Sequence, residues 1–341
     1  TVGTVDANKK YIVTVAKNGQ LTITKRTVTL KSADLDKKYD GNALENGNVP
    51  LAVEDGFVDG EGATYAFTGS QTLVGSSDNE FTYTLNEGTD AGNYTINTQF
   101  GKLKVTDREE GDKLKITVEA NSGSKTYDGK PLTVDGFKTL SFEVEGNTYT
   151  VEGLTASATG TNVSDSKDVV VEGTAVVKDA AGNDVTKQFT VTSKPGKLTI
   201  NPYMISIEPT ETTFPYNGEE PKVKTDKIEI RNENDGKGLL LNHHVESIET
   251  EGSGVDAGTY EWFSGHNAKI LDGNNDVTAN YQISYTAKTM TITPAPLTVT
   301  TEGGSKVYDG KPLTNEVGNI TGLVNGETAK VKTTGSQTEV G

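Results

Sequence analysis

The chain contains no cysteine among its 341 residues. This absence excludes disulfide bonds, thiol nucleophiles and cysteine-ligated zinc sites. Proline, histidine and tryptophan are also scarce, with ten, three and one copies. No run of about 18 apolar residues occurs, which is the length that a membrane-spanning helix requires. We therefore expect no direct membrane insertion.

An excess of positive charge is also lacking, because 32 lysines and arginines stand against 48 acidic residues. Proteins that bind phosphate backbones need clustered basic side chains, so we expect no nucleic-acid partner. The net charge of −16 also argues against binding to anionic membranes. The hydrophobic content of 33% indicates several small cores rather than one large one. The apolar residues alternate too regularly for a disordered chain.

A tyrosine-containing motif occurs four times, and its tyrosines are 88, 89 and 92 residues apart. This period exceeds the roughly 20–50 residues of solenoid repeats. Each repeat is therefore expected to be a small domain with its own core. We call the motif the tyrosine turn, and its four copies are Tyr39-Asp40-Gly41, Tyr127-Asp128-Gly129, Tyr216-Asn217-Gly218 and Tyr308-Asp309-Gly310.

A second landmark closes each complete repeat. An aromatic residue is followed nine positions later by Leu or Met, as in Tyr94 and Leu103, Phe189 and Leu198, and Tyr281 and Met290. Constant spacing is expected where strands pair. The two landmarks predict a C-terminal remnant of a preceding repeat (1–25), three complete repeats (26–107, 112–201 and 203–294) and the N-terminal part of a fourth (296–341).

Strict alternation of apolar and polar residues marks the strands. Leu114, Ile116 and Val118 share one face of "KLKITVEA", and the same pattern places Val28 with Leu30, Ile205 with Ile207, and Leu297 with Val299. Period two indicates strands with one buried face. We predict an all-β fold, a tandem array of small antiparallel sandwich-like modules, because parallel strands need long crossovers. A β-grasp-like topology is the alternative, and it requires a helix across the sheet.

The tyrosine turn itself has a structural interpretation. Asp-Gly supplies a turn that needs positive φ, which glycine adopts without steric cost and which Asn in place of Asp also tolerates. The tyrosine ring is expected to pack on the core while its hydroxyl reaches a backbone partner. A ligand-binding tyrosine cluster is the alternative.

The connections between the repeats are short. Pro202, Pro294 and Pro296 lie in the second and third of them. Proline fixes φ and biases the preceding residue toward extended geometry. Few-residue stiff connections predict a semi-rigid rod.

Candidate chemical groups are few, and we expect no catalytic residue, cofactor or metal. His243, His244 and His266 all lie in the third repeat, and neighbouring histidines of a strand point to opposite faces. We interpret them as surface loop residues. The acidic stretches 179–184 and 272–276 lack the bidentate Glu and oxygen spacing of a calcium loop, so we interpret them as hairpin turns; whether they bind calcium stays open.

An intramolecular Lys–Asn isopeptide bond is a further hypothesis for rod-like bacterial domains. Asn93 and Asn280 precede the aromatic of the terminal strand, but Gln188 takes that place in the second repeat. The sequence leaves this question open.

The tyrosine turns, read as "YDGKPLT" from Tyr127 and Tyr308, together with the closing "GKLTI" from Gly196, resemble the MBG or YDG-type repeat family. These are mostly-β modules found in tandem in large bacterial surface proteins and adhesins. The third turn departs from the motif at Asn217. The resemblance covers nearly the whole chain and implies export, attachment to the bacterial cell surface and no catalytic residues.

The function expected from this resemblance is that of a non-catalytic stalk or adhesive region of an exported protein. An extracellular protein or glycan is the expected partner. A glycan- or host-ligand-binding module, with an exposed aromatic patch near Trp262, is one alternative. An accessory region of a larger secreted enzyme is another.

The two ends of the chain complement each other in sequence. The stretch "YIVTVAKNGQLTIT" from Tyr11 has the pattern of closing strands, whereas 296–341 has that of an opening. We expect a section of a longer array whose ends fray, and a monomer in dilute solution. Head-to-tail donation of strands by a neighbouring molecule is the alternative.

Overall fold

The computed structural model describes residues 19–232, 236, 238–240, 242–252 and 254–341. In this part of the chain the fold is mostly β, as predicted, and helical structure is confined to short 3-10 turns. The helix that a β-grasp-like topology requires is not among the described elements. The same residues contain no helix long and apolar enough to cross a membrane.

The chain forms two compact units. The first contains the described residues up to 118 together with 139–154 and 173–192. The second contains 119–138, 155–172 and 193–341. The predicted second repeat therefore contributes to both compact units.

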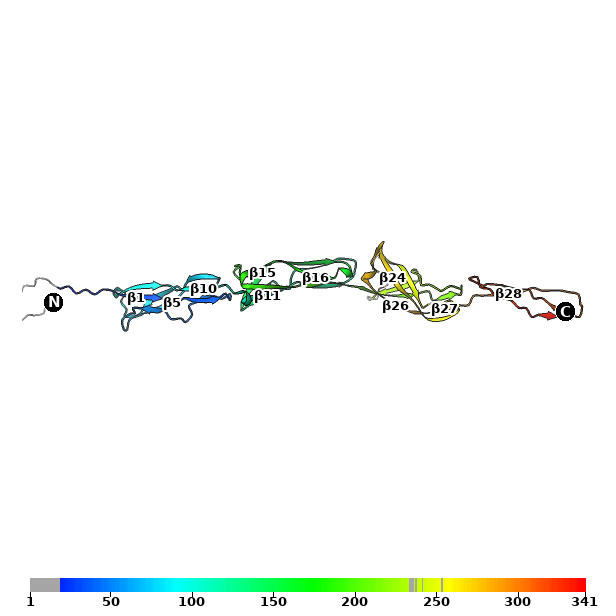
Figure 1. Cartoon of the computed structure of the whole chain (residues 1–341), viewed down its shortest axis with the longest axis horizontal. Coiled ribbons are helices and arrows are strands. Elements are labelled where there is room, and N and C mark those ends of the chain that lie inside the picture. The colour runs from blue at the N-terminus through cyan, green and yellow to red at the C-terminus, as the bar shows by residue number, and fades with distance from the viewer. Residues whose placement is uncertain (1–18, 233–235, 237, 241, 253) are drawn as a thin grey trace, which may run out of the picture. The chain divides into compact units, whose positions relative to one another are not determined.

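The first predicted repeat lies in the first compact unit (Figure 1). Its sheets have the strand orders β4-β1-β9, β2-β10-β7, β3-β6 and β5-β8. The elements are β1 (Arg26–Lys31), β2 (Leu35–Lys38), β3 (Leu44–Glu45), β4 (Ala52–Glu54), β5 (Ala63–Phe67), β6 (Ser70–Gln71), β7 (Gly75–Asp78), β8 (Phe81–Leu85), η1 (Ala91–Asn93), β9 (Tyr94–Gln99), β10 (Lys102–Thr106) and η2 (Glu110–Asp112).

The second predicted repeat follows with the pairings β11-β18, β12-β19-β16 and β13-β15-β14, and β17 pairs with β15. Its elements are β11 (Leu114–Glu119), β12 (Gly123–Thr126), β13 (Leu132–Asp135), β14 (Ser141–Val144), β15 (Asn147–Gly160), η3 (Val163–Asp165), β16 (Lys167–Val169), β17 (Val171–Asp179), η4 (Thr186–Gln188), β18 (Phe189–Lys194) and β19 (Gly196–Asn201).

The third predicted repeat has the strand orders β22-β20-β26 and β21-β27-β24-β23, and β25 pairs with β24. Its elements are β20 (Tyr203–Pro209), β21 (Thr213–Pro215), β22 (Ile228–Asn232), β23 (His243–Glu251), β24 (Gly258–Asp272), β25 (Asn275–Asp276), η5 (Thr278–Asn280), β26 (Tyr281–Tyr285) and β27 (Lys288–Thr293).

The prediction of purely antiparallel modules is wrong. β1 runs parallel to β9, and β2 runs parallel to β10. The corresponding pairs β12–β19, β20–β26 and β21–β27 are parallel as well. Parallel strands need a long crossover, and here most of a repeat provides it, because its first strands pair with its last. Other pairs, such as β10–β7 and β5–β8, are antiparallel.

The last strand of each complete repeat, which we call the closing strand (β10, β19 or β27), anchors the local core. Its alternate residues are buried, namely Leu103 and Val105, Leu198 and Ile200, and Met290 and Ile292. Two buried apolar side chains of this size contribute roughly 1.5–3 kcal/mol each. The predicted inward faces of Leu114, Ile116 and Val118 and of Ile205 and Ile207 are confirmed.

The fourth predicted repeat is less complete. It contains β28 (Thr298–Thr301), β29 (Leu313–Thr314), β30 (Gly318–Thr321) and β31 (Ser336–Gln337), paired as β28-β30 and β29-β31 (Figure 1). The prediction that Leu297 and Val299 form a buried face is wrong, because both are exposed. In the described residues β28 has one partner strand, whereas β1 and β20 each have two, so less of the sheet covers these side chains.

Candidate functional site: the tyrosine turns

Three of the four tyrosine turns are built around a lysine three residues before the aspartate. Lys37 Nζ lies 2.7 Å from Asp40 Oδ1 and donates to the Asn42 carbonyl at 2.8 Å. Lys125 makes the same two contacts with Asp128 and Lys130, and Lys306 makes them with Asp309 and Lys311. The side chain thereby ties both sides of the turn together.

The aspartate of these turns also organises the backbone. Asp128 Oδ1 accepts a hydrogen bond of 2.9 Å from the Lys130 backbone N–H. The Lys125 ammonium and this N–H together hold the pKa of the Asp128 carboxyl below its ordinary value of 3.8. Hydrogen bonds to the ionised form stabilise it. The turn therefore favours a charged aspartate.

The third turn departs from this plan at two positions together. Phe214 stands where the other copies have lysine, and Asn217 stands where they have aspartate. Asn217 Oδ1 still accepts from the Glu219 N–H at 3.0 Å, so the local backbone hydrogen bond is kept. A carboxylate without its lysine would lose its ionic partner, and a neutral amide avoids this.

The glycine of each turn adopts the left-handed conformation that the sequence predicts. Its φ is +82° at Gly41, +73° at Gly129, +78° at Gly218 and +71° at Gly310. A side chain at such a φ is disfavoured by clash with the backbone. The glycines differ in what lies beside them, however. A β-carbon on Gly41 or Gly218 would meet side chains of the following repeat, whereas one on Gly129 or Gly310 would have no neighbour within 4 Å.

The tyrosine of each complete repeat is fixed to the closing strand by its backbone. The N–H groups of Tyr39, Tyr127 and Tyr216 donate to the carbonyls of Thr106, Asn201 and Thr293 at 2.8–3.0 Å. These acceptors are the last residues of the closing strands. Each tyrosine thus lies where one repeat ends and the chain continues into the next.

Within the first compact unit, Tyr39 is buried against the second predicted repeat. Its hydroxyl faces Tyr149 of β15, whose ring packs edge-on against Phe189 with centroids 4.7 Å apart. Burial raises the pKa of the Tyr39 hydroxyl well above its ordinary value, and the Tyr149 hydroxyl adds to this shift. The Tyr149 hydroxyl is itself buried and makes no hydrogen bond of ordinary geometry. The hydroxyl of Tyr39 therefore meets a side chain and not the predicted backbone partner.

Asn147, the first residue of β15, completes this contact. Its side-chain amide lies 3.3 Å from the carbonyl of Asp40 and from Asn42 Oδ1. A β-carbon on Gly41 would stand 2.2 Å from the Tyr149 hydroxyl oxygen and 2.8 Å from the Asn147 amide. Glycine is therefore required here for close approach as well as for its φ.

Gln188 adds a second polar link in the same compact unit. Its carbonyl oxygen accepts from the Arg108 N–H at 2.9 Å, and its amide donates to Asp107 Oδ1 at 2.6 Å. Arg108 in turn donates through Nη1 to the Tyr39 carbonyl at 2.8 Å. Gln188 is buried, and a buried amide is stable only when its polar atoms are paired. A groove of about 520 Å³ lies beside these residues and is also lined by Asp184 and Lys187.

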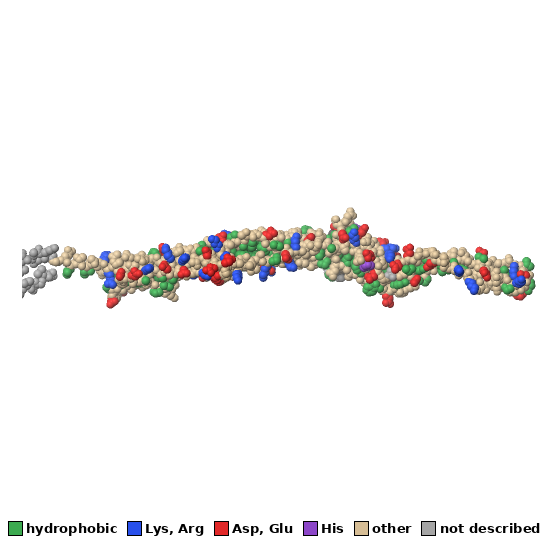
Figure 2. Space-filling model, in the orientation of Figure 1, with side chains coloured by type: hydrophobic (Ala, Val, Ile, Leu, Met, Phe, Trp, Pro, Cys, Tyr) green, Lys and Arg blue, Asp and Glu red, His purple; other side chains and the backbone are tan. Residues whose placement is uncertain are grey.

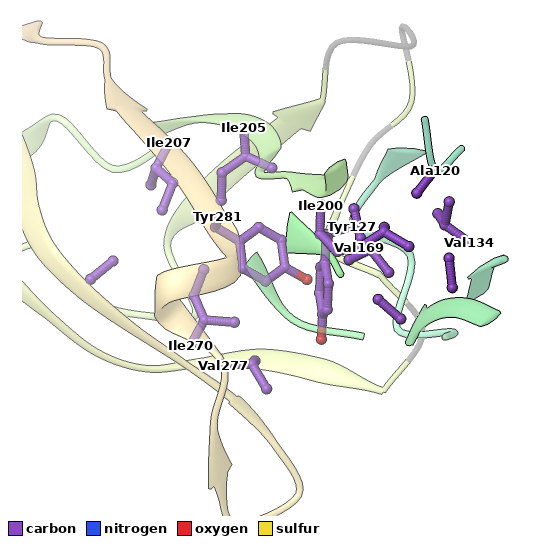
Figure 3. Close-up of a cluster of buried hydrophobic side chains, with 14 residues drawn as sticks. Ala120, Tyr127, Val134, Val169, Ile200, Ile205, Ile207, Ile270, Val277 and Tyr281 are labelled. Atoms are coloured by element: carbon purple, nitrogen blue, oxygen red, sulfur yellow. The ribbon is translucent and has the colours of Figure 1, made fainter. Parts of the chain in front are cut away.

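Within the second compact unit, Tyr127 occupies the corresponding place against the third predicted repeat. Figure 3 shows its ring beside that of Tyr281, among Ile200, Ile270 and Val277. The two ring centroids are 6.0 Å apart at 72°, and Tyr281 shares a hydrogen bond of 2.6 Å with His243 Nδ1. Burial raises the pKa of both tyrosine hydroxyls.

Asn280 occupies the position in this compact unit that corresponds to Gln188, and its side-chain amide is likewise paired. Its side-chain oxygen accepts from the Val163 N–H at 2.8 Å, and its amide donates to Asn162 Oδ1 at 3.0 Å. Both partners belong to the segment around η3 of the second predicted repeat. The amide residue before the terminal aromatic therefore bonds back to the preceding repeat in both cases. The isopeptide hypothesis for these positions stays a prediction.

The third turn contacts the fourth predicted repeat through different residues. The Tyr216 hydroxyl donates to the Glu327 carboxylate, and this hydrogen bond, followed by burial, raises the pKa of Tyr216. The Asn325 amide donates to the Gly218 carbonyl at 2.8 Å. We call each such set of contacts, between a tyrosine turn and the following repeat, a joint.

The fourth turn has no joint among the described residues. Tyr308 is 57% exposed, and nothing lies within 4 Å of a β-carbon placed on Gly310. The lysine–aspartate pair of Lys306 and Asp309 is nevertheless formed at 2.8 Å. The lysine–aspartate pair of the turn therefore forms without a joint.

The interpretation of the histidines as surface loop residues is wrong for all three, since His244 lies in β23 and His266 in β24, and it is furthest from the structure for His243. His243 lies in β23 with a side chain only 5% exposed, because the joint of Tyr127 and Tyr281 covers it. His244 is half exposed on the same strand, and His266 Nε2 lies 3.0 Å from Glu249. Among the described residues no group of three or more His, Asp or Glu side chains is placed to hold a metal ion.

The acidic stretches are hairpin turns, as predicted. Asp179 Oδ1 accepts from the N–H groups of Ala181 and Asn183, and residues 178 and 184 form an antiparallel bridge. Asp276 lies in β25, which pairs antiparallel with β24, and accepts from the Thr278 N–H. Their carboxylates therefore bind the turn backbone. Trp262 of β24 is 62% exposed.

The sequence did not single out Tyr149, Asn147, Asn325 or Glu327. One feature of the sequence points to the turns that contain or adjoin these residues. In the second and fourth repeats the asparagine lies beside a glycine, in "EGNTY" and "VNGET", which marks a hairpin turn. These turns could be located from sequence, but their contact with the preceding tyrosine turn could not.

Comparison with models of known protein families found no match to this chain. Comparison with curated proteins likewise found no match.

Proposed function

We propose that this chain is a non-catalytic stalk or adhesive repeat region of an exported bacterial cell-surface protein. The observation that carries the proposal is the recurrence of the joint. At Tyr39, Tyr127 and Tyr216 the same motif holds the end of one repeat against the next. The proposal adopts the MBG-type resemblance that the tyrosine turns carry.

The physical basis is the restriction of motion at each joint. A flexible connection lets neighbouring domains tumble independently. A buried aromatic ring with a paired amide beside it, as at Tyr39 and Gln188, opposes such bending. Repeated joints would make a semi-rigid rod, which is useful for holding a binding partner away from a cell surface.

The surface composition fits an extracellular role without a charged polymer as partner. On the face that Figure 2 shows, Lys and Arg side chains are interspersed with Asp and Glu. The net charge of −16 favours solubility and opposes nonspecific association.

Small-angle scattering of the whole chain tests the rod. We expect an elongated particle whose maximum dimension falls in a Tyr39→Ala/Tyr127→Ala double variant, because the joints then bend. A compact wild-type particle would contradict the proposal. Cell-surface labelling of the protein in its source bacterium tests export separately.

One observation favours a second candidate, a glycan-binding module. Trp262 exposes 62% of its surface on β24, and exposed tryptophan rings stack well on sugar faces. A glycan array with the wild-type chain and with Trp262→Ala distinguishes the two. Specific binding that the substitution abolishes would favour the glycan-binding module over a stalk alone.

A further inference from the structure

The beginning and the end of the first repeat pair with each other in one constant register. Arg26 of β1 pairs with Tyr94 of β9, and Leu35 of β2 pairs with Leu103 of β10, in parallel in both cases. The partner lies 68 residues later in each pair, so the register does not change from one strand to the next. Residues 26–38 therefore form a single pairing with residues 94–106, which we call the clamp.

Hydrogen bonds also cross the short interruption between the strands of the clamp. The Ser32 N–H donates to the Gln99 carbonyl at 3.1 Å, and the Ser32 hydroxyl accepts from the Gly101 N–H at 2.9 Å. The Lys102 N–H donates to Asp34 Oδ1 at 2.7 Å. The clamp of the first repeat is thus hydrogen-bonded continuously from β1 and β9 through to β2 and β10.

The third repeat contains the same clamp within the second compact unit. Tyr203 pairs with Tyr281 and Thr213 pairs with Thr291, both in parallel and both 78 residues apart. In the second repeat β12 pairs with β19 in the same direction. The parallel pairing of opening and closing strands is therefore a property of the repeat.

The place of the clamp in the chain decides how a repeat responds to tension. When the first repeat is stretched along the chain, force enters through residues 26–38 on one side and through residues 94–106 on the other. All its other strands lie within residues 39–93. These residues form the loop that the clamp closes, so the backbone of this loop carries no tension while the clamp holds.

Tension of this kind loads the clamp in shear. Because the two segments are parallel, the first is drawn toward its N-terminus and the second toward its C-terminus, in opposite directions along the same axis. The hydrogen bonds of a parallel ladder are evenly spaced, so they share the force and must break together. Two strands that are pulled apart at the same end would instead separate one pair at a time.

We propose that the repeats of this chain bear tensile load, and that the clamp is the element that resists extension. This function goes beyond that of a rod, because a rod is defined by its resistance to bending at the joints. It follows from the topology of a single repeat, and it therefore does not depend on where the protein is located or on what it binds.

Single-molecule stretching of the whole chain tests the clamp, and the absence of native cysteine allows handles to be attached at chosen residues. Lys25→Cys/Glu109→Cys places the handles on exposed positions before β1 and after β10, and loads the clamp in shear. Lys25→Cys/Asn93→Cys places both handles at the end where Arg26 pairs with Tyr94, and peels the clamp open. Forced unfolding reports the unfolding barrier, so at one loading rate we expect the force in shear to be at least about twice the peeling force.

The length released identifies the unfolding event. In the shear arrangement the residues between the handles extend the tether by up to roughly 300 Å, at about 3.3–3.6 Å per residue. Because residues 39–93 carry no tension while the clamp holds, this length should be released in one step. Equal forces in the two arrangements, or release of this length in several steps at lower force, overturn the proposal.

A matched pair of substitutions separates load bearing from stability. Asp34 accepts from the Lys102 N–H across the clamp, whereas Asp90 accepts from the Gly92 N–H at 2.8 Å inside the closed loop. Both aspartates are exposed, so either change to alanine leaves the core intact. At constant force in shear, Asp34→Ala should shorten the folded lifetime by about fivefold or more, and Asp90→Ala by less than about twofold. Equal shortening by the two substitutions overturns the assignment of the load to the clamp.

Discussion

The side-chain amide of Asn325 donates to the Gly218 carbonyl oxygen at 2.8 Å, and its Cβ lies 2.4 Å from where a β-carbon on Gly218 would stand. Asn147 contacts the Asp40 carbonyl in the first compact unit in a similar way. In both pairs the asparagine lies 107 residues after its partner. An asparagine in or next to a turn of one repeat thus packs against the tyrosine turn of the repeat before it, and the absence of a side chain on the glycine provides the space.

Two glycines of the tyrosine turns allow two contributions to stability to be measured separately, namely the close packing of a neighbouring residue and the strain of a positive φ. Gly41 and Gly129 have similar positive φ, but a β-carbon meets the Tyr149 hydroxyl at 2.2 Å only at Gly41. We expect Gly129→Ala to cost about 1–2 kcal/mol from the left-handed conformation. Gly41→Ala should cost about 1–3 kcal/mol more because of overpacking.

Native-state hydrogen exchange at the Tyr39 and Tyr127 amides measures both effects locally. It is preferable to a global midpoint, since a chain with several repeats need not unfold in two states. Equal losses of protection in the two variants would show that close approach at Gly41 carries no cost.

The tyrosines allow a similar comparison between a joint and a free turn. Tyr127→Ala removes a buried ring from the contact with Tyr281, and such truncations cost about 3–5 kcal/mol. Tyr308→Ala in the exposed fourth turn should change stability by less than about 0.5 kcal/mol. Native-state hydrogen exchange in the residues around each turn compares the two, and similar losses of protection would contradict the role of the joint.

The strands and turns could be predicted because they depend on local pattern. The alternation of Leu114, Ile116 and Val118 and the glycine of each tyrosine turn act within a few residues. The direction of pairing could not be predicted in this way. β1 joins β9 in parallel across most of a repeat, and alternation is identical for either direction.

The joints are also beyond local pattern. The burial of His243 follows from Tyr127, which is more than a hundred residues away in the sequence. Gln188 and Asn280 can be located in the sequence by their place before the terminal aromatic. Their hydrogen bonds to Arg108 and Val163 depend on how one repeat sits against the next, which no pattern within a repeat encodes.

The lysine–aspartate pair of the tyrosine turn predicts a dependence on pH. The Lys125 ammonium and the Lys130 N–H lower the pKa of Asp128 in the folded chain. A lowered folded pKa stabilises the fold above the ordinary value, and this contribution is lost as the pH falls through the folded pKa. The turn should therefore be most stable at neutral pH and weaken below about pH 4.

Titration of the Asp128 carboxyl by NMR checks this directly. We expect a midpoint below the ordinary value of 3.8, and Lys125→Met should move it upward. The third turn is a natural control, since Asn217 has no carboxyl to titrate. A midpoint at or above 3.8 in the wild-type chain would contradict the interpretation of this pair.

Gln188 tests the polar part of a joint. Gln188→Ala leaves the partly buried Arg108 N–H without its partner, at a cost of about 1–3 kcal/mol, whereas the exposed Asp107 carboxylate can bind water instead. The exposed Asn93→Ala, at the corresponding place in the first repeat, is the matched control and should be nearly neutral. Chemical denaturation followed at Phe189 and Tyr149 by NMR measures the difference, and equal effects would show that Gln188 contributes little.

The final prediction concerns amide protection in dilute solution. The Tyr127 N–H is bonded to the Asn201 carbonyl at 2.8 Å and lies in a buried joint. The turn of Tyr308 is exposed, and Gly304 to Val307 pair with no strand in the described residues. Exchange at the Tyr308 amide should therefore be faster than at Tyr127 by several orders of magnitude, because opening of the latter requires disrupting a core.

Hydrogen exchange with fragment analysis in dilute solution measures this contrast. The segment 296–341 should exchange fastest among the repeats, because its apolar residues Leu297, Val299 and Val307 are exposed. Strong protection throughout 296–341 in dilute solution would contradict this prediction, because it would show that the fourth repeat closes its own core.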